Sequence, residues 1–213
     1  MDDFLKGVYV SEVKKQCEFG LAAVSYLNHA LHQIHNDALQ RDEQQFYHSE
    51  VFRQTHSLLT HASNVSRMFW PPLPKQKKNE TDEHYESRLL NIDKVVRGRA
   101  LKSEYGLDDS NPLKNRSLRD HLEHYDERLD HWRNNSVNRN ILSDTIGPPN
   151  AVVGLAASDM MRWFDPTRSM FRFRGEEYDL QAIASSIDQL LVISCRLQQE
   201  LWDRRVNRSE HSA

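Results

Sequence analysis

Residues 179–201 read DLQAIASSIDQLLVISCRLQQEL, and this stretch decides the fold. Asp179 can cap a helix, because its carboxylate can accept hydrogen bonds from the free backbone N–H groups of the first turn. The side chains that follow recur every three or four positions and form one stripe: Leu180, Ile183, Ile187, Leu190, Ser194, Leu197 and Leu201. A helix with one apolar stripe must bury that stripe against other elements. The stretch therefore predicts a long helix inside a helical bundle.

Four upstream segments repeat this periodicity. They predict helices over about 10–36, 47–69, from 81 to near 106, and from about 115 through 132. Pro71 and Pro72 end the second of these helices, because proline is rejected by helix interiors. Thr81 is a candidate N-cap for the third, and Gly106 marks the end of that helix.

Residues 134–178 lose the helical period. Within them, 170–173 alternates briefly between apolar and polar residues before Arg174-Gly175, which predicts a small hairpin. Together these patterns predict an all-α fold, an antiparallel bundle of about five helices with an irregular excursion before the last one. We expect a single domain over 1–213 and a flexible tail over about 205–213.

The composition limits the classes of function. Only 7 glycines occur in 213 residues, which agrees with a helix-rich fold. The formal net charge of −3 argues against a protein that coats nucleic acid through bulk charge, so any RNA contact must be local. The two cysteines, Cys17 and Cys195, are far apart and form no zinc motif. We find no long apolar span and no export signal, and we expect a cytoplasmic protein without a membrane contact.

Ionisable residues are densest over 116–132, which reads RSLRDHLEHYDERLDHW. With about 100° per residue, Asp120, His124, Glu127 and His131 gather on the helix face opposite the apolar stripe. Arg119 lies off that face. It can reach the histidine through its long side chain, through a loosened first turn, or from a second subunit.

The run from Arg119 through Asp120 to His124 resembles the signature of HEPN domains (higher eukaryotes and prokaryotes nucleotide-binding), in which an arginine, a polar residue, three further residues and a histidine lie on one bundle helix. Arg116 to His121 fits the looser form of that signature equally well. We prefer Arg119 and His124, because only there does a carboxylate follow the arginine and share the face of the histidine.

The resemblance implies RNA cleavage or nucleotide binding without a metal or cofactor, commonly at the seam of a homodimer. His124 would act as acid or base, Arg119 would stabilise phosphate charge and Asp120 would orient the imidazole. Weaker candidates for RNA contacts are Arg116, His121, Glu127, Arg128 and His131. The resemblance also implies a toxin or phage-defence setting with an antitoxin-type protein partner.

Two alternatives stay open. The charged face can be merely solvated, with ordinary ion pairs three or four residues apart, so that the chain is a non-catalytic scaffold for a protein partner. His121, His124 and His131, with Asp120 and Glu127, can instead supply nitrogen and oxygen donors for a metal.

Overall fold

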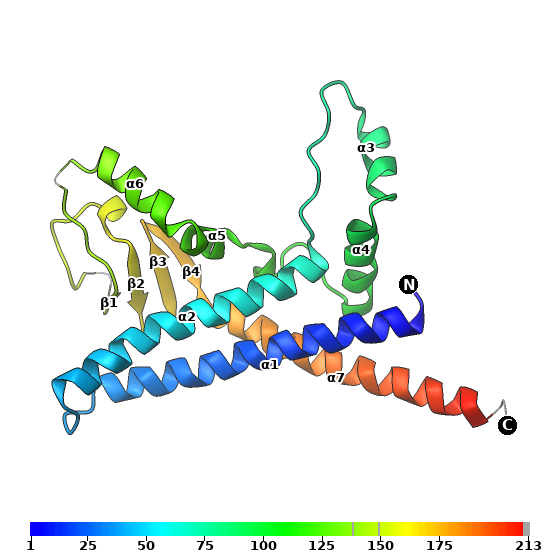
Figure 1. Ribbon diagram of the computed structural model, residues 1–213, viewed down its shortest axis with the longest axis horizontal. Helices are drawn as coiled ribbons and strands as arrows, with labels where there is room; N and C mark the ends of the chain where they lie inside the picture. Colours follow the sequence, from blue (N-terminus) through cyan, green and yellow to red (C-terminus); the bar gives the residue numbers. More distant parts are fainter. Residues whose placement is uncertain (138, 149, 211–213) are drawn as a thin grey trace. The chain divides into compact units, whose positions relative to one another are not determined.

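The computed structural model describes residues 1–137, 139–148 and 150–210, and the side chains of 118, 119 and 208–210 lie outside that description. The chain is mostly helical, with 65% of its residues in helices. Its α-helices are α1 (Asp3–Ile34), α2 (Arg41–Phe69), α3 (Asp82–Leu89), α4 (Asp93–Tyr105), α5 (Ser117–Glu123), α6 (Tyr125–Asn135) and α7 (Leu180–Glu210) (Figure 1). Two short 3-10 helices, η1 (Pro112–Lys114) and η2 (Ala157–Asp159), complete the helical content of the described residues.

A four-stranded mixed sheet corrects the expectation of an all-α fold. It consists of β1 (Thr145–Ile146), β2 (Arg162–Asp165), β3 (Met170–Phe173) and β4 (Glu176–Asp179), in the order β1-β2-β3-β4. β1 is parallel to β2, and the other two pairs are antiparallel. The predicted hairpin is confirmed as β3–β4, where Arg174 and Gly175 make the turn at φ of 49° and 90°. Strands β1 and β2 were not predicted: β1 is only 2 residues long and pairs with β2 across the intervening chain, and β2 joins β3 through the turn at 166–169.

The sequence signals for helix ends are confirmed at three positions. The Thr81 hydroxyl accepts a hydrogen bond from the backbone N–H of His84 at 3.3 Å, and the carboxylate of Asp179 accepts one from Ala182 at 2.8 Å. Gly106 takes the left-handed conformation after α4, with φ of 63°. Two predicted helices are each divided, the third between α3 and α4 and the fourth at His124. The expected count of about five helices therefore becomes seven in the described residues.

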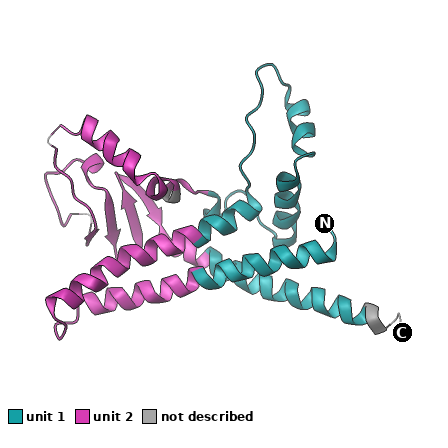
Figure 2. Cartoon of the chain, in the orientation of Figure 1, with its two compact units in different colours: residues 1–19, 61–114, 186–213 teal, residues 20–60, 115–185 magenta. Residues whose placement is uncertain are grey.

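The chain divides into two compact units (Figure 2). Unit 1 comprises 1–19, 61–114 and 186–213, and unit 2 comprises 20–60 and 115–185. The prediction of a single domain is not decided by this division and stays a prediction. In the tail, α7 continues through Glu210, and residues 211–213 lie outside the described residues.

Unit 1 is helical in its described residues and has a tightly packed core. The ring of Tyr105 lies edge-on to Phe69 with the centroids 5.0 Å apart, and its hydroxyl is 2.9 Å from the hydroxyl of Ser194. Gly98 permits α4 to approach the end of α2, because a Cβ there would lie 2.8 Å from the carbonyl oxygen of Phe69. Ser194, the single polar interruption in the predicted stripe, is thus paired inside the core.

Unit 2 packs its sheet against α2. Phe52 of α2 and Phe171 of β3 meet edge to face at 6.3 Å. Trp163, Phe164 and Phe173 are also buried, which fits strands that cover a core. The aromatic residues of the predicted excursion therefore serve as the core of this unit, and α5 and α6 belong to the same unit.

One described helix, Leu180–Asn207, is long and apolar enough to cross a membrane by length and composition alone. Its apolar residues at Ile187, Leu190 and Leu197 are buried within the protein. The core helix of a soluble protein passes the same test, so this helix is weak evidence for a membrane span.

Candidate functional site

The predicted helix over the ionisable run is broken at His124, which has φ of −104° and ψ of 38°. This corrects the expectation of one straight helix that aligns Asp120, His124, Glu127 and His131 on a single face. Neither proline nor glycine marks the break. Instead, His121 stacks on Phe173 at 5.2 Å and Tyr125 lies edge-on to the same ring at 6.0 Å, and both contacts come from distant sequence.

Both ring nitrogens of His121 are engaged. Arg128 donates from Nε to Nδ1 of His121 at 3.1 Å, so Nδ1 must be an acceptor. Nε2 then carries the proton and faces Oε2 of Glu176 at 3.4 Å. The imidazole of His121 is thus held between an arginine, a carboxylate and the Phe173 ring, and no ring nitrogen is left open as a base.

Glu176 links His121 to the start of α5. Tyr178 donates from its hydroxyl to Oε2 of Glu176 at 2.5 Å, and Ser117 donates to the Tyr178 hydroxyl at 3.1 Å. The hydrogen bond from Tyr178 is the main cause that lowers the pKa of Glu176, with further contributions from His121 and Arg128. Burial raises the pKa of Tyr178 to about 12. This network positions α5 and contributes no free acid or base at neutral pH.

His131 lies at the other end of the same surface. Arg174, in the β3–β4 turn, donates from an Nη to Nδ1 of His131 at 2.9 Å. A neutral His131 therefore carries its proton on Nε2 and offers a donor to solvent. This geometry suits anion binding better than proton abstraction.

His124 differs from both neighbours. Its Nδ1 lies 3.1 Å from Oε1 of Glu127, and the two side chains are 54% and 62% exposed. Because a carboxylate can only accept, Nδ1 carries a proton, and in the neutral imidazole Nε2 keeps its lone pair. No hydrogen bond from a described residue reaches Nε2. The arrangement is that of a general base oriented by a carboxylate.

The arginines predicted beside this histidine are placed as follows. The side chain of Arg119 lies outside the described residues. Arg116 is half-buried at the N-terminus of α5, and Asp120 is exposed. The carboxylate that the structure places on His124 is that of Glu127, whereas the orienting role of Asp120 stays a prediction. Arg128 lies on α6, and its side-chain contact is with His121.

A second feature of unit 2 is a pocket of about 540 Å³ beside Tyr125. Arg162 extends into its wall, where Nε lies 2.7 Å from Oδ1 of Asp144 and an Nη donates to Oδ2 at 2.8 Å. The guanidinium also lies over the Tyr125 ring, 4.8 Å from its centroid. We did not predict this pocket. The alternation of arginine with aromatic residues over 162–174 is the signal in the sequence that could have indicated it.

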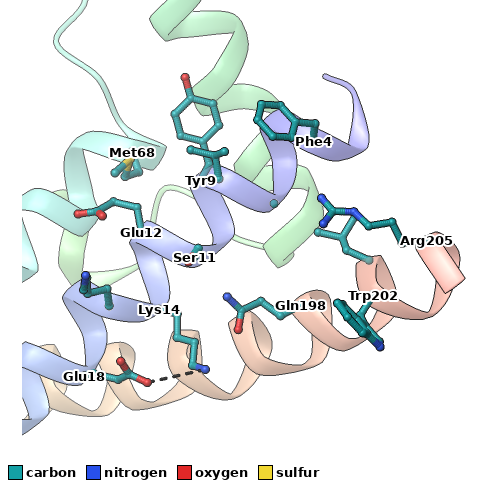
Figure 3. Close-up of a pocket in the computed structure, with 14 residues that line it drawn as sticks. Phe4, Tyr9, Ser11, Glu12, Lys14, Glu18, Met68, Gln198, Trp202 and Arg205 are labelled. Carbon is teal, nitrogen blue, oxygen red and sulfur yellow. Dashed lines mark ion pairs between the residues drawn. The ribbon is translucent and has the colours of Figure 1, made fainter.

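Unit 1 contains a groove of about 850 Å³ between the N-terminal part of α1 and the C-terminal part of α7 (Figure 3). Phe4 and Trp202 line it and are 68% and 61% exposed. Lys14 and Glu18, also in its lining, form an ion pair at 3.8 Å. The groove offers apolar surface and no titratable pair suited to catalysis.

Within the described residues, no group of three or more His, Cys, Asp or Glu side chains is arranged to hold a metal ion. The metal-binding alternative for the histidine-rich face therefore has no geometric support in that part of the chain. No protein-family model, no curated protein and no solved structure matches this chain.

Proposed function

We propose that unit 2 is an RNA-cleaving module that uses His124 as its general base and needs no metal. The observation that carries this proposal is the contact between Nδ1 of His124 and Glu127, which leaves Nε2 as the accepting nitrogen of the neutral, exposed imidazole. His121 and His131 lack this arrangement, because an arginine donates to a ring nitrogen of each.

The chemistry follows from these side chains. Nε2 of His124 removes the proton from a ribose 2′-hydroxyl, and the oxygen attacks the adjacent phosphorus. The bond from phosphorus to the 5′-oxygen breaks, which gives a 2′,3′-cyclic phosphate and a free 5′-hydroxyl. Glu127 stabilises the imidazolium that forms. Arg128 uses Nε for its contact with His121, so its Nη groups can donate to the phosphate oxygens.

A homodimer belongs to this proposal. The leaving 5′-oxygen needs a proton from the side of the phosphate opposite to the base, and a second His124 from another copy can supply it. The arrangement would match the HEPN-like bundle, with paired motifs at a seam, that the run from Arg119 to His124 resembles. A cytoplasmic setting and an antitoxin-type partner are the remaining parts of that proposal.

RNA cleavage in the presence of a chelator tests the assignment. We expect the wild-type chain to cut a single-stranded RNA in EDTA and to leave a 2′,3′-cyclic phosphate. His124→Ala should cut at least about 100-fold more slowly, since general base catalysis contributes about that much or more. His84→Ala is the matched control, because His84 is an exposed histidine of α3 in unit 1. Equal cutting by wild type and His124→Ala would refute the proposal.

A second candidate function, a helical scaffold that binds a protein partner, is supported by the apolar groove of unit 1. Phe4 and Trp202 there leave large aromatic surface in water, which is typical of interaction sites. Trp202→Glu should abolish association with that partner, or with a second copy. Light scattering of the wild type and the variant measures the second-copy case directly.

A further inference from the structure

The pocket beside Tyr125 has features that the cleavage chemistry at His124 does not use. Its walls include three aromatic side chains from separate elements, Phe52 of α2, Tyr125 of α6 and Phe171 of β3. Its volume of about 540 Å³ lies within the range of roughly 300–1,000 Å³ that is usual for small-molecule sites. All of its lining residues belong to unit 2.

We propose that this pocket binds a nucleotide, with the guanidinium of Arg162 as the stacking platform for the base. The inference rests on the proposed function, because it takes the ligand to be the RNA or nucleotide on which that function acts. It adds the site that recognises the base, which the contact between His124 and Glu127 does not provide. Tyr125 follows His124 directly in the chain and so connects the pocket to the proposed catalytic group.

Arg162 is fixed before any ligand binds. Both Nε and an Nη contact the carboxylate of Asp144, at 2.7 Å and 2.8 Å. The guanidinium carbon also lies 4.8 Å from the centroid of the Tyr125 ring and 6.0 Å from that of Phe52. Bases stack on arginine planes and on aromatic side chains, and a side chain that is already ordered loses little entropy when it binds.

Polar side chains around the pocket provide hydrogen bonds at its edge. Gln45, His48, Ser49 and His56 of α2 offer amide, imidazole and hydroxyl groups. Such groups can contact the edge of a base or a phosphate oxygen. Arg53 also lines the pocket, although its guanidinium is paired with Glu50.

Other classes of ligand fit this pocket less well. A purely apolar ligand would remove water from Arg162 and Asp144 without replacing its hydrogen bonds. An inorganic anion would leave the half-buried Tyr125 ring uncovered and would meet the carboxylate of Asp144. A planar aromatic ring with polar edges and an attached phosphate uses both sets of groups, and this combination defines a nucleotide.

Binding measurements with the full chain test the inference. The probes are a fluorescein-labelled single-stranded 2′-O-methyl oligoribonucleotide, which has no free 2′-hydroxyl and cannot be cut, followed by anisotropy in EDTA, and the four ribonucleoside monophosphates, followed by calorimetry. Ser49→Trp should weaken binding at least about tenfold, because it fills the pocket from an exposed position on α2. Ser87→Trp, on the exposed face of α3 in unit 1, is the matched control and should bind as wild type does. Arg162→Lys keeps the charge but loses the plane, and it should weaken binding several-fold.

The outcomes separate this inference from the proposed cleavage. Binding of the monophosphates that Ser49→Trp weakens identifies a site for free nucleotides, and the same effect on the oligoribonucleotide alone identifies a base within a strand; either result supports the inference. If wild type binds neither probe, or Ser49→Trp binds as tightly as Ser87→Trp, the inference is wrong. If His124→Ala binds normally but no variant or wild type cuts RNA, the pocket stands and the cleavage proposal falls. If wild type cuts RNA, and Ser49→Trp cuts and binds it equally well, the cleavage proposal stands and the nucleotide pocket is wrong.

Discussion

Helix α7 and the α5–α6 pair were both predicted from one apolar stripe, yet only α7 uses its stripe as a core. In α7, Ile187 and Leu190 are at most 1% exposed, whereas α6 has no buried residue. α7 is continuous over 31 residues, and the other segment breaks at His124 after a helix of 7. The difference shows that apolar spacing predicts a helix in both places, but that burial depends on the partners that arrive from distant sequence.

The largest effect that tests this comparison is on stability. Ile187→Ala should lower the free energy of unfolding by about 2–5 kcal/mol, because it leaves a cavity in a closely packed core. Leu129→Ala, at an apolar residue of α6, should change the free energy of unfolding by no more than about 1 kcal/mol, because Leu129 is only half-buried. Urea unfolding followed by circular dichroism measures both. Equal losses in the two variants would contradict the contrast between the helices.

A smaller effect comes from the polar interruption in the α7 stripe. Tyr105→Phe removes the hydroxyl that contacts Ser194, and Ser194 still donates to the carbonyl of Leu190 at 2.7 Å. We therefore expect a loss of about 1 kcal/mol at neutral pH, the usual contribution of one buried hydrogen bond. Ser194→Ala is a second variant that removes the same contact and should cost a similar amount.

The alkaline pH dependence gives a separate readout of the same contact. Burial raises the pKa of Tyr105 to about 12 from its ordinary value of 10.0, so the folded state holds a proton that the unfolded state releases. The contribution of this phenol to the free energy of unfolding should accordingly be complete below pH 10 and should fall as the pH rises toward 12. Tyr105→Phe should reduce this fall. An identical slope in wild type and variant would show that the Tyr105 phenol does not titrate as described.

The sequence predicts the helical part of this fold well, because local signals determine it. Thr81, Gly106 and Asp179 mark helix ends by their own chemistry, and the Met170–Phe173 alternation with Arg174-Gly175 marks a hairpin. The sheet beyond that hairpin was missed, because β1 is only 2 residues long and finds its register through contacts with β2.

The candidate site was predicted only in part, for the same reason. The periodicity places His124 and Glu127 within one turn, and the contact between them is local. The contacts of His121 with Phe173 and Glu176 join residues more than 50 positions apart. Helical spacing alone therefore cannot show which histidine has both ring nitrogens engaged and which has one without a partner among the described residues. Arg162 and Asp144 meet across a loop in the same way.

The smallest predicted effect tests what anchors α5, which precedes a helix without a fully buried residue. Tyr178→Phe removes the hydrogen bond that chiefly lowers the pKa of Glu176, so that pKa should rise toward 4.5, while His121 and Arg128 still hold it somewhat lower. A carboxyl whose pKa is lowered by folding stabilises the protein above its ordinary pKa, and this contribution is lost as the pH falls through the folded value. The variant should therefore lose less stability on acidification than wild type does. Carbon-detected NMR titration of Glu176 measures the shift, with Tyr26→Phe as the control at an exposed tyrosine. An unchanged pKa in Tyr178→Phe would mean that the Tyr178 hydroxyl does not hold Glu176 against His121.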